Sequence, residues 1–441
     1  DRAPHRSFYY AMGETEQDVA KPFVGVVSTW NEAAPCNTAL MRQAQSVKKG
    51  VKQSGGTPRY DYRFFNIYGN FDAEYLGFNG VYPQNIQLDN LRSETLTGKN
   101  VGLNLQLFDR KVQLDVDVYQ NRTTYLLFEN LAISSVSGYG SLSDQNVGTI
   151  DNQGWEIGLY TTPVKTDKWK VDFNFNISRN QNIIREISEF FPSEQGNIDR
   201  NGEYKRFLQI DNPFGSFYGY RFKGVYADLD ATRARDANGN VITGPNGQEV
   251  FMRFNYPAID YTFQPGDAIY EDINKDGNID SRDIVYLGNS NPKFIGGFGP
   301  TVTLNNQFKF ILFFTYRLNY DIINGTDMVT TNLYGYDNQS TAVLSRWRNP
   351  GDETNIPRAV FQGGYNWLGS DRYVEDASFL RVRSATFSYN FGKNFLKKMK
   401  MDDLRIFLTA DNLLTFTNYR GQDPEVSMRG GDPFSIAIDY S

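Results

Sequence analysis

Residues 101–119 read VGLNLQLFDRKVQLDVDVY, and their alternation decides the fold class. Aliphatic side chains alternate with glycine and amides before Asp109–Arg110, and with glutamine and aspartates after it. Successive side chains of a strand point to opposite faces, so the stretch predicts a β-hairpin with one aliphatic and one polar face. A soluble sandwich would bury the aliphatic face in its core, whereas a membrane barrel would turn it towards lipid.

The same alternation recurs along the chain. It predicts strands at 155–159 and 169–177 around a turn at Pro163, one long strand from Phe308 to Ile322, and a pair at 385–391 and 404–410. Segments rich in Gly, Asn and Asp separate the strands, at 196–204, 228–249 and 327–369. Short turns on one side and long loops on the other are typical of outer-membrane barrels. We expect about 12 to 14 strands.

Composition favours the membrane barrel. Of 441 residues, 15% are aromatic, yet the mean hydropathy is −0.53. A barrel with a wet lumen needs apolar residues only at alternate positions, with aromatic girdles at both interfaces. No run approaches the length of a transmembrane helix. The net charge of −6 suggests no nucleic-acid partner.

The first 59 residues have a different texture. Phe23–Ser28 (FVGVVS) predicts a short buried strand, and Thr38–Val51 has helical spacing that Gly55, Gly56 and Pro58 end. Asp1–Met12 lacks the pattern of a secretory signal, so we expect a mature product or a piece of a longer protein. The predicted fold class is therefore all-β: a partial antiparallel transmembrane β-barrel at 60–441, preceded by a short α/β leader at 1–59.

One segment has the spacing of a calcium loop. Residues 272–283 read DINKDGNIDSRD. Oxygen ligands are expected from Asp272, Asn274, Asp276, Asn278 (through its carbonyl), Asp280 and Asp283, while Gly277 allows the sharp turn. Aspartate replaces the usual glutamate at the twelfth position. We expect Ca²⁺ with a structural role in an external loop, and the alternative is a plain turn rich in Asp and Asn.

Other candidate site residues are fewer. Six aromatic residues lie in or beside the segment 327–369 and would stack on sugars or grip a peptide: Tyr334, Tyr336, Trp347, Tyr365, Trp367 and Tyr373. An interface girdle or loop packing explains them at least as well. His5 is the only histidine and Cys36 the only cysteine, which disfavours a catalytic triad and excludes an internal disulfide. No catalytic residues are predicted.

The alternating part resembles SusC/RagA-type TonB-dependent outer-membrane receptors in their C-terminal part. The matching stretches, in the expected order, are Glu94–Tyr119, Asn146–Leu159, Pro265–Pro300, Asp376–Phe391 and Leu404–Pro424. The resemblance implies a location in the outer membrane, a complete barrel of about 22 strands around a plug, and import of glycans or peptides. It also implies three partners: membrane lipid, a SusD-like surface lipoprotein and the TonB complex. We expect the plug, the TonB-contacting segment, the early strands and the closing strand to lie outside this sequence.

The leader resembles the N-terminus of dihydroxy-acid dehydratase, an iron–sulfur enzyme of branched-chain amino-acid synthesis. The similarity lies in DRAPHRSFYYAMG, KPFVGVVSTWNEAAPCN and VKKGVKQSGGTPR. It implies that Cys36 is a vestigial cluster ligand. The other cluster cysteines are absent, so no iron–sulfur cluster and no enzyme activity are expected. We interpret the chain as a chimera joined near Gly55–Tyr60.

Three functions therefore compete: a fragment of an import receptor, a dehydratase represented only by its inactive leader, and a soluble β-rich binding module. The cysteine count argues against the dehydratase. Dependence on detergent separates the receptor from the soluble module. The imported substrate is not predicted by the sequence, and an open sheet would have two exposed edges that invite aggregation.

Overall fold

The computed structural model describes residues 68–75, 78–83, 86, 88, 90–132, 141–188, 194–195, 204, 206–207, 209–256, 259–425 and 438–439. The leader with His5 and Cys36, its boundary at residue 59 and most of the segment 196–204 lie outside these residues. The chain divides into two compact units. One contains Gln120–Asp151 and Arg185–Phe191 with the chain up to Lys99, and the other contains Asn100–Tyr119, Asn152–Ile184 and Pro192–Ser441.

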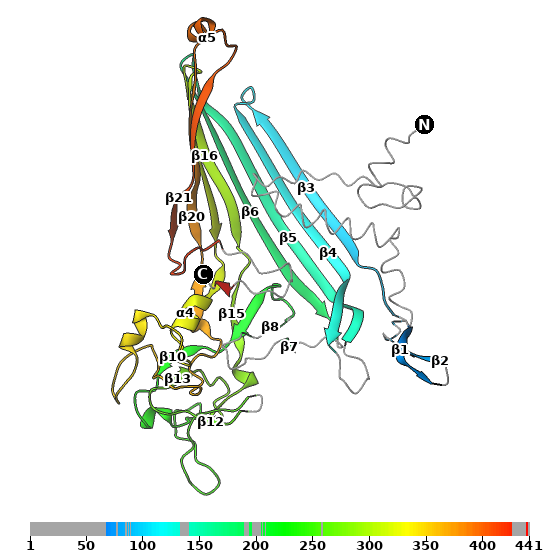
Figure 1. Ribbon diagram of the computed structural model, residues 1–441, viewed down its shortest axis with the longest axis vertical. Coiled ribbons are helices and arrows are strands. Elements are labelled where there is room, and N and C mark those ends of the chain that lie inside the picture. The colour runs from blue at the N-terminus through cyan, green and yellow to red at the C-terminus, as the bar shows by residue number, and fades with distance from the viewer. Residues whose placement is uncertain are drawn as a thin grey trace. The chain divides into compact units, whose positions relative to one another are not determined.

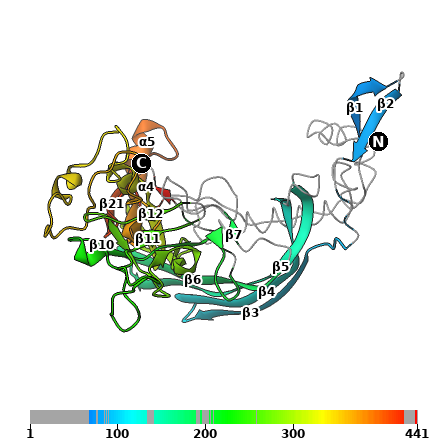
Figure 2. The ribbon, with the colours of Figure 1, turned by 90° about the horizontal axis from the view of Figure 1, so that it is seen from below.

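An eight-stranded sheet is the main element (Figure 1), with the order β21-β20-β17-β16-β6-β5-β4-β3. Its strands are β3 Thr95–Leu107, β4 Val112–Ala132, β5 Ser141–Lys165, β6 Trp169–Ile187, β16 Phe294–Leu304, β17 Phe308–Leu318, β20 Phe379–Asn390 and β21 Arg405–Thr417. The pairs from β6 to β21 are antiparallel. Figure 2 shows β3, β4, β5 and β6 side by side in chain order. The predicted all-β class is confirmed, while the count of 12 to 14 strands stays a prediction.

The two faces of the sheet have the predicted chemistry. On β20 and β21, Phe387 and Leu408 lie opposite each other and are 47% and 73% exposed. On the other face, the hydroxyls of Thr386 and Thr409 are 3.0 Å apart and share a hydrogen bond. Large apolar side chains thus remain uncovered by the described protein on one face, as a lipid-facing wall requires.

Most strand predictions are confirmed, and two details are wrong. The turn expected at Pro163 falls later in the chain, because β5 continues to Lys165. The chain reverses after Thr166, whose N–H donates to the Trp169 carbonyl at 2.8 Å. The expected strand from Phe308 to Ile322 is broken, because β17 ends at Leu318 and Asn319 has a φ of 58°. A left-handed residue turns the chain out of the sheet.

Short strands and turns fold into a second structure, which we call the loop body (residues 216–289 and 321–377). It contains the pairs β9 Ser216–Gly219 with β15 Val285–Asn289 and β10 Phe222–Val225 with β13 Ala268–Tyr270, and the triple β12 Tyr261–Thr262, β11 Arg253–Phe254 and β14 Asn278–Ile279. A further triple joins β19 Val374–Asp376, β18 Asp321–Asn324 and β22 Ile438–Asp439. Its core is largely aromatic and includes fully buried Tyr220, Phe254 and Phe263.

The remaining elements are small. They are the pairs β1 Tyr68–Tyr75 with β2 Phe78–Pro83 and β7 Glu194–Gln195 with β8 Arg206–Phe207, the helices α4 Gly325–Thr330 and α5 Lys393–Met399, and the 3₁₀ turns η3 Asp230–Thr232, η4 Ser281–Asp283, η5 Thr341–Ser345 and η6 Asp371–Tyr373. Among the described residues, no helix combines the length and the apolar character needed to cross a bilayer. Figure 1 places α5 and the loop body at opposite ends of the strands.

Candidate functional site

Within the loop body, an ion pair with a buried carboxylate fastens the segment after η5 to the turn between β12 and β13. Arg358 Nε lies 2.7 Å from Asp267 Oδ1, and the Asp267 side chain is 0% exposed. Tyr261 donates its hydroxyl hydrogen to Asp267 Oδ2 at 2.7 Å, and the Gln264 N–H donates to the same oxygen at 2.8 Å. Both oxygens of this carboxylate are thus hydrogen-bonded, and a buried charge is tolerated only with such partners.

Trp347 is fixed by packing against the same turn. Gly266 has a φ of +87°, and a Cβ there would meet the Trp347 ring at 2.3 Å. The Trp347 indole donates its Nε1–H to the Ala227 carbonyl at 3.3 Å. Gly266 therefore serves both a left-handed turn and the close approach of an indole ring.

The structure separates the six predicted aromatic residues into two groups. Trp347, Trp367 and Tyr373 are at most 9% exposed and pack the interior of the loop body. Tyr365 stacks on Trp367 with ring centroids 5.9 Å apart, and Tyr334 lies against the same indole at 4.4 Å. Tyr336 is 91% exposed. Only Tyr336 among the six presents most of its ring to the surroundings.

Tyr336 has an aromatic neighbour that the sequence analysis did not single out. Its ring centroid lies 4.7 Å from that of Phe361, which is itself 53% exposed. The backbone beside the pair is tied where Gln362 donates its N–H to the Tyr334 carbonyl at 3.0 Å. Leu333 and Gln362 have φ values of 53° and 51°. Side chains held on strained, tied backbone of this kind are common at ligand-binding loops.

The predicted calcium loop forms the expected sharp turn. Asp272 accepts hydrogen bonds from the Asp276 and Gly277 N–H groups at 3.3 and 2.8 Å, and Gly277 has a φ of +85°. At the end of the loop, Asp283 accepts from the Ile273 and Asp280 N–H groups at 2.8 and 2.9 Å. The carboxylates at both ends of the loop are thus oriented by its own backbone.

An arginine stands beside the remaining acidic groups of this loop. Arg282 Nη2 is 2.5 Å from Asp276 Oδ2 and from Asp280 Oδ2. Hydrogen bonds from Arg282 lower the pKa of Asp280, whereas burial raises the pKa of Asp283. Among the described residues, no three His, Cys, Asp or Glu side chains converge as metal ligands. A cation would therefore need Arg282 to move aside, and the calcium site stays a prediction.

Tyr220 is buried near the same loop, close enough for the charges of Asp280 and Asp283 to act on its hydroxyl. In the β10–β13 ladder Phe222 pairs with Tyr270, which brings Tyr220 next to the start of the loop. Tyr220 is 0% exposed, and its hydroxyl has no hydrogen-bond partner. Burial raises the pKa of Tyr220, and the carboxylate of Asp283 raises it further. A buried hydroxyl without a partner is unfavourable unless water or a ligand completes it.

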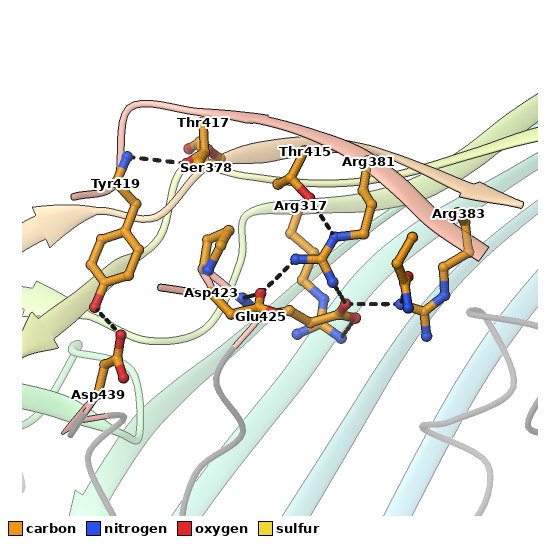
Figure 3. A network of polar contacts seen from close by, with 12 residues as sticks. Arg317, Ser378, Arg381, Arg383, Thr415, Thr417, Tyr419, Asp423, Glu425 and Asp439 are labelled. Atoms are coloured by element: carbon orange, nitrogen blue, oxygen red, sulfur yellow. Dashed lines mark hydrogen bonds and ion pairs between the residues drawn. The ribbon is translucent and has the colours of Figure 1, made fainter. Parts of the chain in front are cut away.

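A second charged network fastens the chain after β21 to one face of the sheet (Figure 3). Arg381 on β20 donates from Nη1 to Glu425 Oε2 at 2.9 Å and also pairs with Asp423. Arg317 from β17 and Arg383 from β20 approach the Glu425 carboxylate at 3.1 and 3.2 Å. Three arginines from two strands thus hold two carboxylates of the following segment.

Neighbouring groups support this network. Arg381 has a side chain only 7% exposed, and its Nε donates to the Thr415 hydroxyl at 3.0 Å. Burial acts to raise the pKa of Asp423, but the hydrogen bonds from Arg381 and the Glu425 N–H, together with the charges of Arg381 and Arg383, outweigh this and the pKa is lowered. Tyr419 donates its hydroxyl hydrogen to Asp439 at 2.7 Å (Figure 3). The sequence analysis missed this site, although FLRVRS does place two arginines at alternate positions of a strand.

Comparison with known proteins supports two separate similarities. The chain is 29% identical over 370 residues to TonB-dependent receptor P3 of Formosa agariphila, covering 82% of this chain and 34% of that protein. TonB-dependent receptor P39 of the same organism is 28% identical, with 81% and 35% covered. The chain thus spans about a third of the length of these curated relatives.

A solved structure has the same fold. The RagAB peptide transporter superposes with a TM-score of 0.62 at 20% identity, over 86% of this chain and 37% of that one. The body of the chain therefore resembles transport receptors and not enzymes.

The leader matches a different family. The model "Dihydroxy-acid/6-phosphogluconate dehydratase N-terminal" covers residues 21–68. Dihydroxy-acid dehydratase of Pelagibacter ubique is 93% identical over 59 residues, which is 13% of this chain and 10% of the enzyme. Residues 60–441 thus resemble the C-terminal barrel part of TonB-dependent outer-membrane receptors, and residues 1–59 resemble the N-terminus of dihydroxy-acid dehydratases.

Proposed function

We propose that residues 60–441 form part of the wall and outer loops of an outer-membrane receptor that imports peptides or glycans with energy from the TonB complex. The observation that carries this proposal is the sheet whose aliphatic face stays exposed, as at Val101 (74%) and Leu408 (73%). Water would make such a face unfavourable by about 25 cal/mol for each Å² exposed, whereas lipid would not. The receptor-like sequence and fold support the same proposal.

Detergent dependence tests the membrane part of this proposal. The full chain would be refolded into detergent micelles or lipid vesicles and, in parallel, into plain buffer. We expect β-structure with a cooperative unfolding transition only in the micelles or vesicles. A chain that stays folded and monomeric in plain buffer would support a soluble binding module instead.

A surface lipoprotein belongs to the same proposal. The RagAB peptide transporter has the fold of this chain, and we propose that a SusD-like lipoprotein covers the loop body. The loop body lies at the end of the strands opposite the hairpin turns (Figure 1), which is the outer side of a barrel whose short turns face the periplasm. Labelling of a cysteine introduced by N338C with an impermeant reagent on intact cells would check this orientation.

The exposed pair Tyr336 and Phe361 is the proposed substrate contact within the loop body. Aromatic rings bury a large area at low entropic cost and contribute about 0.5–1.5 kcal/mol beyond area burial. We expect Y336A/F361A to weaken binding of the peptide or oligosaccharide that the receptor takes by roughly tenfold. Leu344→Ala is the matched control, because Leu344 is 66% exposed in the same segment. An equal effect of both variants would remove the specific role of the rings.

Calcium would stabilise the loop 272–283 in this proposal. Asp272 and Asp283 are already oriented by backbone N–H groups, and the buried hydroxyl of Tyr220, which has no partner, lies within reach of the charge of Asp283. A hard cation that takes six to eight oxygens would replace Arg282 as the neutralising charge. Calcium titration of the full chain against D276A would test the site, because unchanged uptake in the variant contradicts it.

Residues 1–59 have no proposed role in import. We propose that they derive from a separate coding sequence joined near Gly55–Tyr60, and that Cys36, the only cysteine, holds no iron–sulfur cluster by itself. Long reads of the source DNA across this junction would test the origin. One intact reading frame in many independent molecules would contradict it.

A further inference from the structure

The hairpin between β20 and β21 ends in an unusual surface at helix α5. Over residues 392–401 the chain reads GKNFLKKMKM, with four lysines, and Asp402 and Asp403 follow before β21 begins. Leu396 is buried, but Phe395, Met399 and Met401 are 43%, 51% and 44% exposed. Lysines and large apolar side chains thus lie together on one short exposed segment.

This segment continues the lipid-facing side of the sheet. The ring of Phe308 lies 4.7 Å from that of Tyr389, Tyr389 lies 4.9 Å from Phe391, and Phe391 stacks on Phe395 at 4.9 Å. Tyr389 pairs with Phe308 and Ile406 in the ladder, on the face that carries exposed Phe387 and Leu408. An unbroken row of rings therefore leads from the apolar face to α5.

Two other hairpin turns also place basic residues beside an exposed aromatic ring, although each includes one aspartate, Asp109 or Asp167. Phe108, 73% exposed, precedes Arg110 and Lys111 at the β3–β4 turn. Trp169, 46% exposed, follows Lys168 at the β5–β6 turn. Figure 1 shows the β3–β4 turn and α5 at the same end of the strands. Basic and aromatic residues thus recur together at three hairpin turns, and the turn with α5 has the most lysines.

The segment keeps its form through backbone bonds and not through its lysines. Met401 donates its N–H to the Leu396 carbonyl at 3.0 Å, and Lys400 has a φ of 52° that ends the helix. Phe391 donates its N–H to the Leu404 carbonyl at 3.0 Å, which closes the hairpin. Lys397 and Lys398 are exposed, so their charges are available to an external anion.

We propose that α5 is an anchor that binds the phosphate headgroups of anionic phospholipids at the membrane surface. Apolar side chains beside lysines suit the boundary between acyl chains and headgroups. Lysines near an anionic surface attract it, and the attraction decreases within a Debye length. Short hairpin turns face the periplasm, so the partner is the phospholipid leaflet on that side. This inference rests on the proposed membrane insertion.

A tryptophan at position 395 tests the anchor in the full chain. F395W would be refolded into vesicles of phosphatidylcholine and phosphatidylglycerol in which one lipid or the other is brominated. The quenching of the parent chain would be subtracted from that of F395W, so that the signal of the native tryptophans cancels. We expect brominated phosphatidylglycerol to quench residue 395 more strongly than brominated phosphatidylcholine. M399W serves as a second reporter at an exposed position if F395W folds poorly.

Charge variants in the reporter background make the test specific. K397Q/K398Q should decrease the preference for phosphatidylglycerol by about fivefold for each lysine removed. K223Q/K293Q removes the same charge elsewhere and should leave the preference unchanged. Equal quenching by both lipids, or an equal loss in both charge variants, would overturn the anchor while leaving membrane insertion intact. No quenching by either lipid would overturn membrane insertion and the anchor together.

Discussion

The pair β20–β21 and the loop body use the same kind of residue in opposite ways. Leu408 on β21 is 73% exposed, whereas Phe254 on β11 is 0% exposed and packs against the rings of Tyr220 and Tyr365. The loop body thus supplies its own apolar interior. The sheet instead presents an apolar face that no described residue covers, so the two regions should respond differently to the same change of solvent or sequence.

Charges follow the same division. In the loop body, Asp267 is fully buried and paired with Arg358. At α5, by contrast, Lys397 and Lys398 are exposed. Buried pairs depend on their geometry, whereas exposed lysines depend on an external partner. Four predictions test this comparison, in decreasing order of expected effect.

The largest effect is expected in the core of the loop body. Phe254→Ala removes a fully buried ring and should destabilise the loop body by about 3–5 kcal/mol. Hydrogen exchange of the full chain in micelles would measure this locally. The exposed Phe361→Ala should change the same protection by less than about 0.5 kcal/mol. Equal effects of the two variants would mean that the loop body has no self-sufficient core.

The next prediction concerns the buried ion pair. Arg358→Ala leaves the Asp267 carboxylate buried without its charged partner and should cost about 3 kcal/mol in local stability. Arg253→Ala breaks the exposed pair with Asp260 and should cost less than about 1 kcal/mol. Exchange rates of the N–H groups between Gln264 and Ala268 would report both variants. A small effect of R358A would show that Tyr261 and Gln264 suffice to hold the carboxylate.

A charge placed on either face of β21 tests which face meets lipid. Leu408→Arg should destabilise the sheet by about 2–4 kcal/mol in vesicles, because its side chain would lie in hydrocarbon. Thr409→Arg places the same charge on the opposite face and should cost clearly less, beyond the lost hydrogen bond with Thr386. Urea unfolding from vesicles would compare them. If Thr409→Arg destabilised the sheet more than Leu408→Arg, the face that carries Thr409 would be the one that meets lipid.

The sheet was predictable from sequence because its order is local. Alternation over 101–119, 385–391 and 404–410 shows directly which side chains share a face of the sheet, and those strands form as expected. The end of β17 at Asn319 was not predicted, because the apolar alternation continues past this residue. A single residue in the left-handed conformation turns the chain there. Period alone carries no signal for one such residue.

The loop body was not predictable in the same way. Its core joins residues as distant in sequence as Tyr220 and Leu368, and its strands are two to five residues long. No periodicity can show that Trp347 packs on Gly266 while Tyr336 remains outside. The calcium spacing was readable because all its members lie within twelve residues, yet the role of Arg282 beside Asp276 emerges only from the fold.

The smallest predicted effect lies in the loop 272–283. A tenfold excess of calcium over its Kd should stabilise the loop body by about 1.4 kcal/mol, and D276A should abolish this gain. Burial raises the pKa of Asp283, so without calcium this acid binds its proton more tightly in the folded loop than in the unfolded chain. The stability of the loop is then highest below the pKa of the unfolded state and decreases as the pH rises through the pKa of the folded state.

Calcium should reverse this dependence, because the cation binds the ionised carboxylate and its affinity falls as Asp283 is protonated. Local hydrogen exchange between about pH 4 and about pH 7, with calcium or with a chelator, would separate the two regimes. In Asp283→Asn the acid is absent, so the dependence on pH without calcium should largely disappear. If calcium stabilises the loop equally at both ends of this range, Asp283 is not a ligand, and the loop is held by Arg282 and its backbone N–H groups alone.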